Sequence, residues 1–329
     1  MWNYLLRRLL TMVLTVWIIS ILVFIVIQLP PGDFASNMVS RMTAQTGAAA
    51  DPAVVQQMRR MYGIDQPLPV QYLRWVQNVL TRGRFGYSML YNRDAIDVIR
   101  ERLPMTLALS LSSFMLVWMI SLPAGIYSAV KKYTAGDYIV NFFGFVGLAT
   151  PNFLLALLFL FIAYRYFGVA AFGLFSEQYI EAPWSFAKLF DLARRMIIPV
   201  IVIGTAGTAG LIRTVRANLL DELQKPYVDT ARAKGLKEGK LLWKYPVRHS
   251  LNPFISTLGW ALPALISGEV IVSIVLNLPT AGPILYHALA NQDMYLAAGF
   301  LLVLSALTVI GTFVSDILLA LIDPRIRFQ

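Results

Sequence analysis

Residue types that support catalysis or metal binding are few in this chain of 329 residues. It has no cysteine, which excludes disulfides, cysteine-ligated zinc, iron–sulfur clusters and a thiol nucleophile. The two histidines, His249 and His287, cannot form a metal cluster by themselves. Gly235, Gly239 and Lys240 are spaced G-x-x-x-G-K, which is too short for a phosphate-binding loop and lacks the Ser or Thr that follows its lysine. We therefore expect no catalytic residue, no metal and no cofactor bound by this chain.

The segment 213–253 has the composition of a binding element. It carries nine Lys and Arg residues. Pro226 is suited to the first position of a helix and Gly235 to the position just after a last turn, so the sequence predicts a short helix over 226–234. A second short helix is predicted over 237–244. The acidic residues that accompany the nine cations are Asp221, Glu222, Asp229 and Glu238.

Small residues define one face of the predicted helix 226–234. Ala231 and Gly235 are four residues apart and therefore share a face, which would let the helix enter a groove of a partner. Tyr227, Val228 and Lys234 would contact the partner around that face. We interpret this helix as a docking element.

One carboxylate falls deep inside an apolar run. A charge at the centre of a membrane span costs roughly 2.5–3.5 kcal/mol on insertion scales and usually faces a bundle interior or a water path. Glu269 is thus a candidate pathway or gate residue, and the alternative is a structural hydrogen bond to a neighbouring helix. Asp316 lies closer to the end of its run and is expected at the membrane interface.

The elements that must position these residues are membrane-spanning helices. The chain is 57% hydrophobic and 14% charged, whereas a soluble domain is roughly 45–50% apolar and 25% charged. A helix needs about 20 mainly apolar residues to cross a bilayer. Six runs meet this requirement, which predicts an all-α polytopic membrane protein. These runs are 9–29, 106–130, 138–164, 196–212, 254–278 and 295–322.

The distribution of positive charge predicts the orientation of these spans. Lys and Arg near span ends favour the cytoplasmic side, and placing both termini in the cytoplasm puts the nine cations of 213–253 inside. The net charge of +10 is therefore mainly a topology signal. No basic run interleaved with aromatic residues lies outside the spans, so nucleic acid is not an expected partner.

The chain divides into three parts on this interpretation. Residues 1–30 form an N-terminal anchor span, 31–102 an extracytoplasmic segment with amphipathic helices at 53–62, 70–80 and 95–103, and 103–329 a five-helix core. Gly204, Gly207 and Gly210 make the fourth span small-faced, so that other helix backbones can approach it closely.

The docking segment resembles a known family, the membrane-spanning permease subunits of binding-protein-dependent ABC importers. Their cytoplasmic signature is Glu-Ala-Ala, three residues, then Gly, and residues 229–235 here read Asp-Thr-Ala-Arg-Ala-Lys-Gly. The later Ile-x-Leu-Pro of the family is replaced by Tyr-Pro-Val-Arg at 245–248. The sequence Thr-Ala-Arg-Ala-Lys-Gly-Leu at 230–236 is similar to that of the dipeptide and oligopeptide (peptide/nickel) branch of this family. Further landmarks of that branch are Pro-Gly-Asp at 31–33, Tyr-Gly-Ile-Asp-Gln-Pro-Leu-Pro-Val-Gln-Tyr at 62–72, Arg-Leu-Pro-Met-Thr-Leu at 102–107, Thr-Pro-Asn-Phe at 150–153 and Asp-Pro-Arg-Ile-Arg at 323–327.

The resemblance implies a type I ABC importer permease fold and a role in ATP-driven uptake across a bacterial or archaeal cytoplasmic membrane. It implies a second homologous permease, two cytoplasmic ATPases that bind ATP and Mg, and an extracytoplasmic solute-binding protein. This chain would itself not be an enzyme. The residues that would couple it to the ATPases are Tyr227, Val228, Asp229, Thr230, Ala231, Ala233, Lys234 and Gly235.

The cargo and the transport class leave alternatives. A di- or oligopeptide is the first expectation, but the branch also carries oligosaccharides, opines and nickel chelates. In the fifth predicted span, the Glu-Thr-Val-Phe pattern of this branch is replaced by Ser-Ile-Val-Leu at 273–276. The glutamate of this chain comes earlier, at Glu269. An ion-coupled secondary transporter is a further alternative, which would require internal repeats and buried coupling carboxylates.

Overall fold

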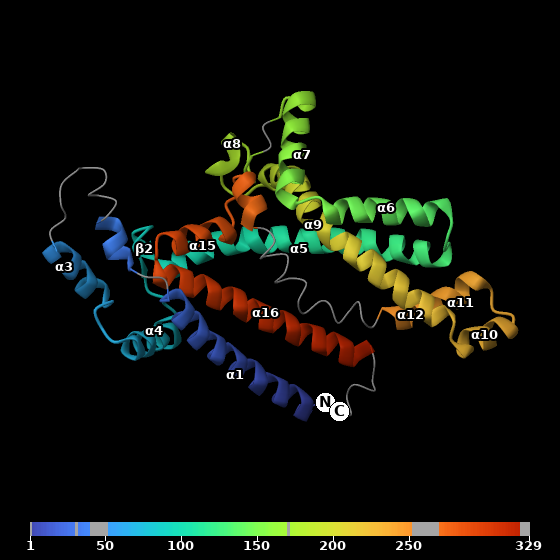
Figure 1. Ribbon diagram of the computed structural model, residues 1–329, viewed down its shortest axis with the longest axis horizontal. Coiled ribbons are helices and arrows are strands. Elements are labelled where there is room, and N and C mark those ends of the chain that lie inside the picture. The colour runs from blue at the N-terminus through green and yellow to red at the C-terminus, as the bar shows by residue number, and fades with distance from the viewer. Residues whose placement is uncertain (1, 30–31, 40–51, 170–171, 252–269, 323–329) are drawn as a thin grey trace. The chain divides into compact units, whose positions relative to one another are not determined.

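The computed structural model describes residues 2–29, 32–39, 52–169, 172–251 and 270–322 of the chain (Figure 1). The described part is mostly helical, with a single two-stranded antiparallel sheet that pairs Tyr87 with Asp94 and Ser88 with Arg93. Residues 34–39 and 270–275 are also helical. The labelled elements are α1 (Trp2–Ile27), α3 (Pro52–Tyr62), α4 (Leu68–Arg82), β1 (Tyr87–Ser88), β2 (Arg93–Asp94), α5 (Ala95–Val130), α6 (Ala135–Ala149), α7 (Asn152–Phe167), α8 (Glu177–Ile180), α9 (Phe186–Leu223), α10 (Pro226–Ala233), α11 (Glu238–Lys244), α12 (Pro246–Ser250), α15 (Ala281–Ala290) and α16 (Met294–Ile322).

Two compact units make up the chain. The first comprises Met1–Tyr4, Leu107–Pro279 and Ile310–Gln329, and the second comprises Leu5–Thr106 and Thr280–Val309. The long helices α5 and α16 contribute residues to both units.

The second unit has its own apolar core. Trp75 of α4 is buried and donates its indole N–H to the Phe85 carbonyl oxygen at 2.8 Å. Burial of apolar surface contributes about 25 cal/mol per Å², which favours this clustering over exposure of the same side chains to solvent. The core residues come from α1, α4, the start of α5, α15 and the start of α16, and include Phe24, Ile27, Trp75, Val98, Ile99, Ala281, Leu296 and Phe300.

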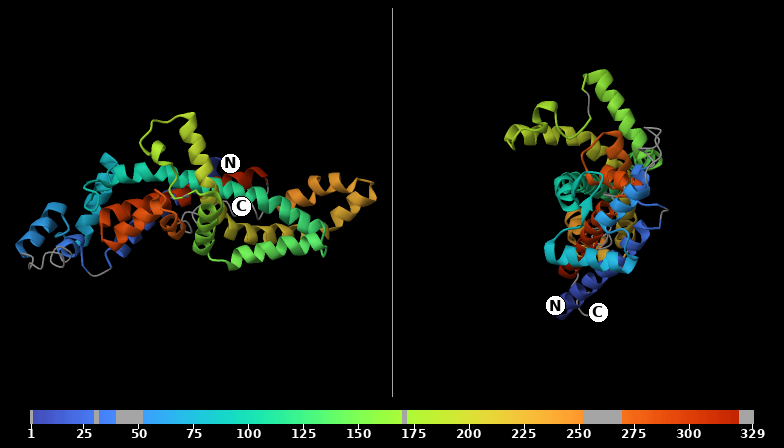
Figure 2. Two further views of the ribbon diagram at one scale, coloured as in Figure 1. Left: turned by 90° about the horizontal axis from the view of Figure 1, so that it is seen from above. Right: turned by 90° about the vertical axis from the view of Figure 1, so that its left-hand side faces the viewer.

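In the first unit α9 is the central helix. The helices α6, α7 and α12 pack against it, and both Figure 1 and the left view of Figure 2 show α6 running along α9. Small residues allow this close packing: a Cβ built on Gly125 would lie 2.7 Å from Val215 Cβ, and one on Gly147 would lie 2.7 Å from Thr205 Cγ2. Ser121 Oγ also donates a hydrogen bond to the Thr208 carbonyl oxygen at 3.2 Å. The α5 and α9 backbones therefore approach closely.

The predicted small face of the fourth span is confirmed only in part. A Cβ on Gly204 or Gly207 would contact side chains of α5, Val117 among them, at 3.4–3.6 Å. A Cβ on Gly210 would meet no described atom within 4 Å. The tightest approach depends instead on Gly125 and Gly147, which lie on the helices opposite α9.

The spans agree with the predicted runs in most but not all places. Among the described residues, three helices are long and apolar enough to cross a membrane, or up to five if each of two bent helix pairs counts as one span. These helices overlap five of the six predicted runs. Most of the remaining run, 254–278, and with it Glu269, lies outside the described residues. The number of six spans therefore stays a prediction.

The run 138–164, expected as one continuous span, is two helices. The helices α6 and α7 meet at an angle of 101°. Thr150 has an extended backbone (φ −88°, ψ 120°), as the residue before a proline prefers, and Pro151 lacks the N–H that would continue the α6 ladder. The run 196–212 is the middle of the 38-residue α9, which bends by 51° between Phe186–Thr205 and Gly207–Leu223.

The predicted amphipathic stretches are found as helices, with one change. The helices α3 and α4 cover the predicted 53–62 and 70–80, and α4 ends at Gly83 in the left-handed conformation (φ 62°). The third stretch, 95–103, is not a separate helix, because α5 continues without a break through Pro104. Buried residues on both sides of this proline, Ile99 and Leu109 among them, offset the loss of its single backbone hydrogen bond.

Candidate functional site

The helix α10 begins and ends as the sequence predicts. Pro226 occupies the first turn, and the helix ends at Ala233 with Lys234 as its cap. Gly235 follows with φ +78°, a left-handed conformation that favours glycine. Its N–H donates to the Arg232 carbonyl oxygen at 3.0 Å, and the Leu236 N–H donates to the Ala231 carbonyl oxygen at 3.3 Å, which satisfies the last turn. The predicted second helix is also confirmed as α11.

One face of α10 packs inside the chain. Val228 is fully buried and Ala231 is 8% exposed, and both pack with the buried Leu241 of α11 into a small core. The expected orientation of two residues was therefore wrong: Val228 and Ala231 face α11 and are not available to a partner. A small residue at 231 is needed because α11 lies against it.

The opposite face of α10 is exposed and polar. Arg232 crosses this surface and pairs with Asp229 at 3.1 Å and with Glu238 of α11 at 2.6 Å. The hydrogen bond from the Arg232 guanidinium lowers the pKa of the Glu238 carboxyl. We call this surface the α10 outer face, and its exposed residues are Asp229, Thr230, Arg232, Ala233, Lys234 and Gly235.

Tyr227 ties α10 to the end of α9. Its hydroxyl donates a hydrogen bond to Glu222, which also pairs with Lys225. Burial next to the Glu222 carboxylate raises the pKa of the Tyr227 phenol. The Tyr227 ring lies edge-on to the His249 imidazole with ring centroids 5.8 Å apart. The start of α10 is thus held by both α9 and α12.

The helix α12 returns the chain to the spans. Pro246 starts it, and Val247 is buried in a core with Ile126 of α5 and with Val215 and Leu219 of α9. The Tyr-Pro-Val-Arg stretch at 245–248 is therefore where the hairpin of α10 and α11 is anchored to the helices of the first unit. Figure 1 shows this hairpin beyond the end of α9.

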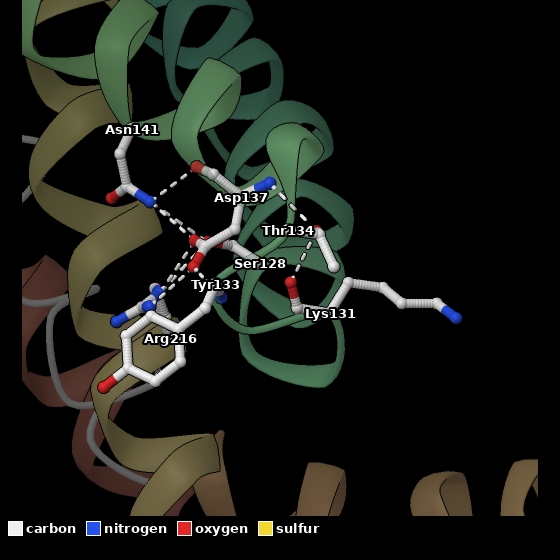
Figure 3. A network of polar contacts seen from close by, with 7 residues as sticks. All are labelled: Ser128, Lys131, Tyr133, Thr134, Asp137, Asn141 and Arg216. Atoms are coloured by element: carbon white, nitrogen blue, oxygen red, sulfur yellow. Dashed lines mark hydrogen bonds and ion pairs between the residues drawn. The ribbon is translucent and has the colours of Figure 1, made fainter.

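Sequence reasoning missed one polar cluster of the first unit. Asp137, at the start of α6, is paired with Arg216 of α9 at 2.8 Å (Figure 3). From the sequence, Arg216 is one of the nine cations of 213–253, and Asp137 is the residue directly before the predicted run 138–164. The available signal was local: Thr134 caps α6 by accepting from the Asp137 N–H, a spacing typical of a helix start. The partner of this carboxylate, 79 residues away, left no signal in the sequence.

Two further features of the sequence concern Glu269 and metal binding. Glu269 lies outside the described residues. Within the part of the chain that the structure describes, no three His, Asp or Glu side chains form a group that could hold a metal ion.

Family comparisons agree over nearly the whole chain. The family described as "Binding-protein-dependent transport system inner membrane component" matches residues 121–328, and the N-terminal family of the same membrane components matches residues 1–110. The chain belongs to this permease family. It is thus a membrane protein and the permease subunit of an ABC importer.

Curated relatives of this permease are similar over their full length. The oligopeptide transport system permease protein AppB of Bacillus subtilis (strain 168) is 34% identical over 326 residues, covering 99% of both chains. A putative peptide permease of Brucella ovis is 31% identical over 99% of both chains, and the glutathione transport system permease protein GsiC of Escherichia coli (strain K12) is 30% identical over 100% of both.

A solved structure shows the same fold. It is titled as inward-facing conformations of the MetNI methionine ABC transporter and matches with a TM-score of 0.51 at 15% identity. The match covers 69% of this permease and 96% of that chain. It supports the type I importer permease fold.

Proposed function

We propose that this permease forms half of a pathway for peptide uptake, driven by ATP hydrolysis on separate cytoplasmic ATPase subunits that dock on the α10 outer face. A second homologous permease forms the other half, and an extracytoplasmic solute-binding protein delivers the cargo. ATP and Mg bind to the ATPases and not to this chain.

The observation that carries the proposal is the two-sided construction of α10. Val228 and Ala231 anchor one face through Leu241, while the other face presents Thr230, Ala233 and Lys234 to solvent. A helix fixed on one side and exposed on the other is suited to receive a force from a partner. Since an effector shifts a conformational equilibrium only through differential contacts, the α10 outer face is where we place the coupling energy.

The names of the relatives support a peptide as the cargo. Permeases named for oligopeptide, peptide and glutathione transport match the full length of this chain at about one third identity or slightly less. The oligosaccharides, opines and nickel chelates carried by other members of the branch become outcomes of the test, read from the molecule that the binding protein retains.

The orientation follows from the charge distribution. With both termini in the cytoplasm, α10 and its basic surroundings lie on the ATP side of the membrane, as the excess of Lys and Arg in 213–253 favours. The helices α3 and α4 then lie on the side where a binding protein delivers solute.

Glu269 is proposed as a pathway residue on sequence grounds alone. Replacing it with glutamine keeps its size and removes its charge. We expect Glu269→Gln to lower uptake by more than it lowers the amount of assembled complex. An equal loss of both would indicate a structural role in assembly.

Purification of the complex from its native membrane tests the whole proposal. Mass spectrometry should identify two ATPase chains or two copies of one, a second permease and a binding protein that retains a peptide. A permease that purifies alone and takes up solute with an ion gradient would contradict the proposal.

A pair of matched variants tests the docking surface. Ala233→Trp adds bulk on the α10 outer face, whereas Met119→Trp adds bulk at an exposed apolar position of α5. We expect only Ala233→Trp to reduce the amount of ATPase that co-purifies with the permease. Retention of the ATPases at the normal amount in both variants would show that they dock elsewhere.

A further inference from the structure

Asp137 lies at the centre of a buried polar network that joins three helices of the first unit. Its side chain is 3% exposed, and that of Arg216 is 23% exposed. Arg216 donates from Nη2 to Asp137 Oδ2 at 2.8 Å and from Nε to Oδ1 at 3.0 Å, so the guanidinium contacts both carboxylate oxygens. Figure 3 shows the two side chains facing each other between α6 and α9.

Three further donors complete the contacts of this carboxylate. The Ser128 hydroxyl of α5 donates to Oδ1, and the Tyr133 N–H donates to Oδ2 at 2.9 Å. Asn141, one turn along α6, donates from Nδ2 to Oδ1 at 2.7 Å. Tyr133 has φ +64°, so the turn between α5 and α6 has the conformation that aims its N–H at Asp137. The network therefore fixes the α5–α6 turn as well as α9.

The geometry of the pair is more restrictive than apolar packing. Two parallel hydrogen bonds between a planar guanidinium and a carboxylate set both distance and orientation, whereas side chains in apolar contact can slide past one another. A buried ion pair is weak support for stability, because apolar residues of similar volume can replace such pairs without loss. Its distinctive property is the fixed position of α9 against α6.

Arg216 is also close to the docking element along the chain. It lies two turns before the end of α9 at Leu223, and the Glu222–Tyr227 hydrogen bond then ties α9 to α10. Leu219, which lies between these two links, and Val215, which precedes Arg216, pack with Ile126 of α5 and Val247 of α12. A continuous set of contacts thus leads from α10 through α9 to the α5–α6 turn.

We infer that Asp137 and Arg216 are positioning residues that transmit movement of the docking helix α10 to the α5–α6 hairpin, so that this hairpin and α9 move together during transport. The inference rests on the proposed function, because it assumes that ATPases act on α10. Neither residue is assigned contact with cargo or nucleotide.

Conservative variants separate positioning from folding. Arg216→Lys keeps the charge but cannot make the two-pronged contact, and Asp137→Asn with Arg216→Gln removes both buried charges together. Arg213→Lys is the matched control, because Arg213 is also on α9 but its guanidinium lies over the Phe145 ring at 5.4 Å. Each variant is purified as the full complex and reconstituted with its binding protein in liposomes.

Three quantities are measured: ATPase that co-purifies, ATP hydrolysed and peptide taken up. We expect normal assembly for Arg216→Lys and for the neutral pair, with peptide uptake per ATP reduced about threefold to thirtyfold, and no change for Arg213→Lys. Peptide uptake per ATP that stays within about twofold of the wild-type value in these variants would overturn the inference. A loss of uptake that only parallels the loss of assembled complex would overturn it as well.

The same experiment distinguishes failure of the proposed function. If the wild-type permease purifies without any ATPase, the proposed function is contradicted and the inference falls with it. If the wild-type complex couples hydrolysis to uptake and the Arg216 variants couple equally well, only the positioning role is overturned.

Discussion

The Tyr227 hydroxyl donates a hydrogen bond to the Glu222 carboxylate and so fastens the first turn of α10 to the last turn of α9. Only Gln224 and Lys225 separate the two helices along the chain. The hydrogen bond and the short connection together leave α10 little freedom to move without α9. The helix α10 is therefore firmly attached to the end of α9.

Removal of that hydroxyl should loosen α10. Tyr227→Phe keeps the ring against His249 but leaves Glu222 with one donor fewer, which we expect to cost about 1–3 kcal/mol. Hydrogen exchange at residues 226–235 should become faster, while Tyr133→Phe, at an exposed tyrosine in another turn, should leave these amides unchanged. Unchanged exchange in Tyr227→Phe would show that α10 is held by its apolar contacts alone.

The small core between α10 and α11 should be sensitive to truncation. Leu241 is fully buried against Val228 and Ala231, so Leu241→Ala should destabilise the hairpin by about 2–5 kcal/mol. Trypsin should then cut faster at Lys234 and Lys237. Trp243→Ala is the control, because Trp243 is 64% exposed on the same helix and its loss should not change cleavage. Equal cleavage rates in both variants would contradict the inward orientation of α10.

At Gly235 the stability of the permease should depend on backbone conformation and not on side-chain bulk. No described atom lies within 4 Å of a Cβ built there, but its φ of +78° disfavours side chains. We expect Gly235→Ala to cost about 1–2 kcal/mol and Gly235→Asn less, since Asn tolerates the left-handed region. Thermal unfolding of the purified permease measures the order. Gly235→Trp should uncouple ATP hydrolysis from transport, because it adds bulk on the α10 outer face. An equal loss of coupling in Gly235→Ala would show that backbone strain, and not bulk, is the cause.

Helix packing predicts that the same substitution, glycine to alanine, changes stability in opposite directions at two positions. Gly125→Ala would place Cβ 2.7 Å from Val215 Cβ and 3.0 Å from the Ile212 carbonyl oxygen, so α5 and α9 must separate, at about 1–3 kcal/mol. For Gly210→Ala, the new Cβ meets no described atom within 4 Å, and the helix gains propensity of up to about 1 kcal/mol. Unfolding midpoints in detergent should fall for the first variant and stay level or rise for the second. The reverse order would contradict the α5–α9 contact.

An acid-sensitive contact is expected in the segment 31–102. Burial would raise the pKa of Asp33, but hydrogen bonds from Ser36 and the Arg59 guanidinium outweigh it and leave this pKa below its usual value. Because the folded value lies below the unfolded value of about 3.9, the ionised contact stabilises the fold at neutral pH and loses its effect as pH falls below about 4. Asp33→Asn should therefore be less stable than wild type at pH 7, with the difference shrinking toward pH 3. A difference independent of pH would show that the charge of Asp33 is not involved.

Local chain signals were sufficient to predict the helices of the docking element. Pro226 and Gly235 set the ends of α10 because both act within one turn of backbone. Its orientation could not be predicted, because Ala231 and Gly235 define a small face without indicating what fills it. Leu241 of the next helix packs against Ala231 and was not identified as a partner from the pattern. Gly235 is exposed on the α10 outer face and does not share that contact.

Long-range relations were the part that sequence could not supply. The hydrophobicity of 138–164 identified an apolar segment, but hydrophobicity does not indicate where a helix changes direction. The 101° turn at Thr150 and Pro151 was therefore missed. The Asp137–Arg216 pair joins two helices, and its two residues are 79 positions apart in the sequence. Composition and periodicity carry no information about a contact between residues so far apart. The family landmarks predicted the type of protein, while these contacts required the fold.

Site-specific cross-linking from α10 tests the central claim most directly. The chain has no cysteine, so a single cysteine introduced by Ala233→Cys can carry a thiol-linked photocrosslinker as the only label on the permease. A cysteine introduced by Met119→Cys serves as the comparison, since that position is exposed on an apolar span. In native membranes the label at 233 should form an adduct with an ATPase subunit, identified by mass spectrometry, and the label at 119 should not. An ATPase adduct from 119 but none from 233, or no ATPase adduct at either position, would contradict the account.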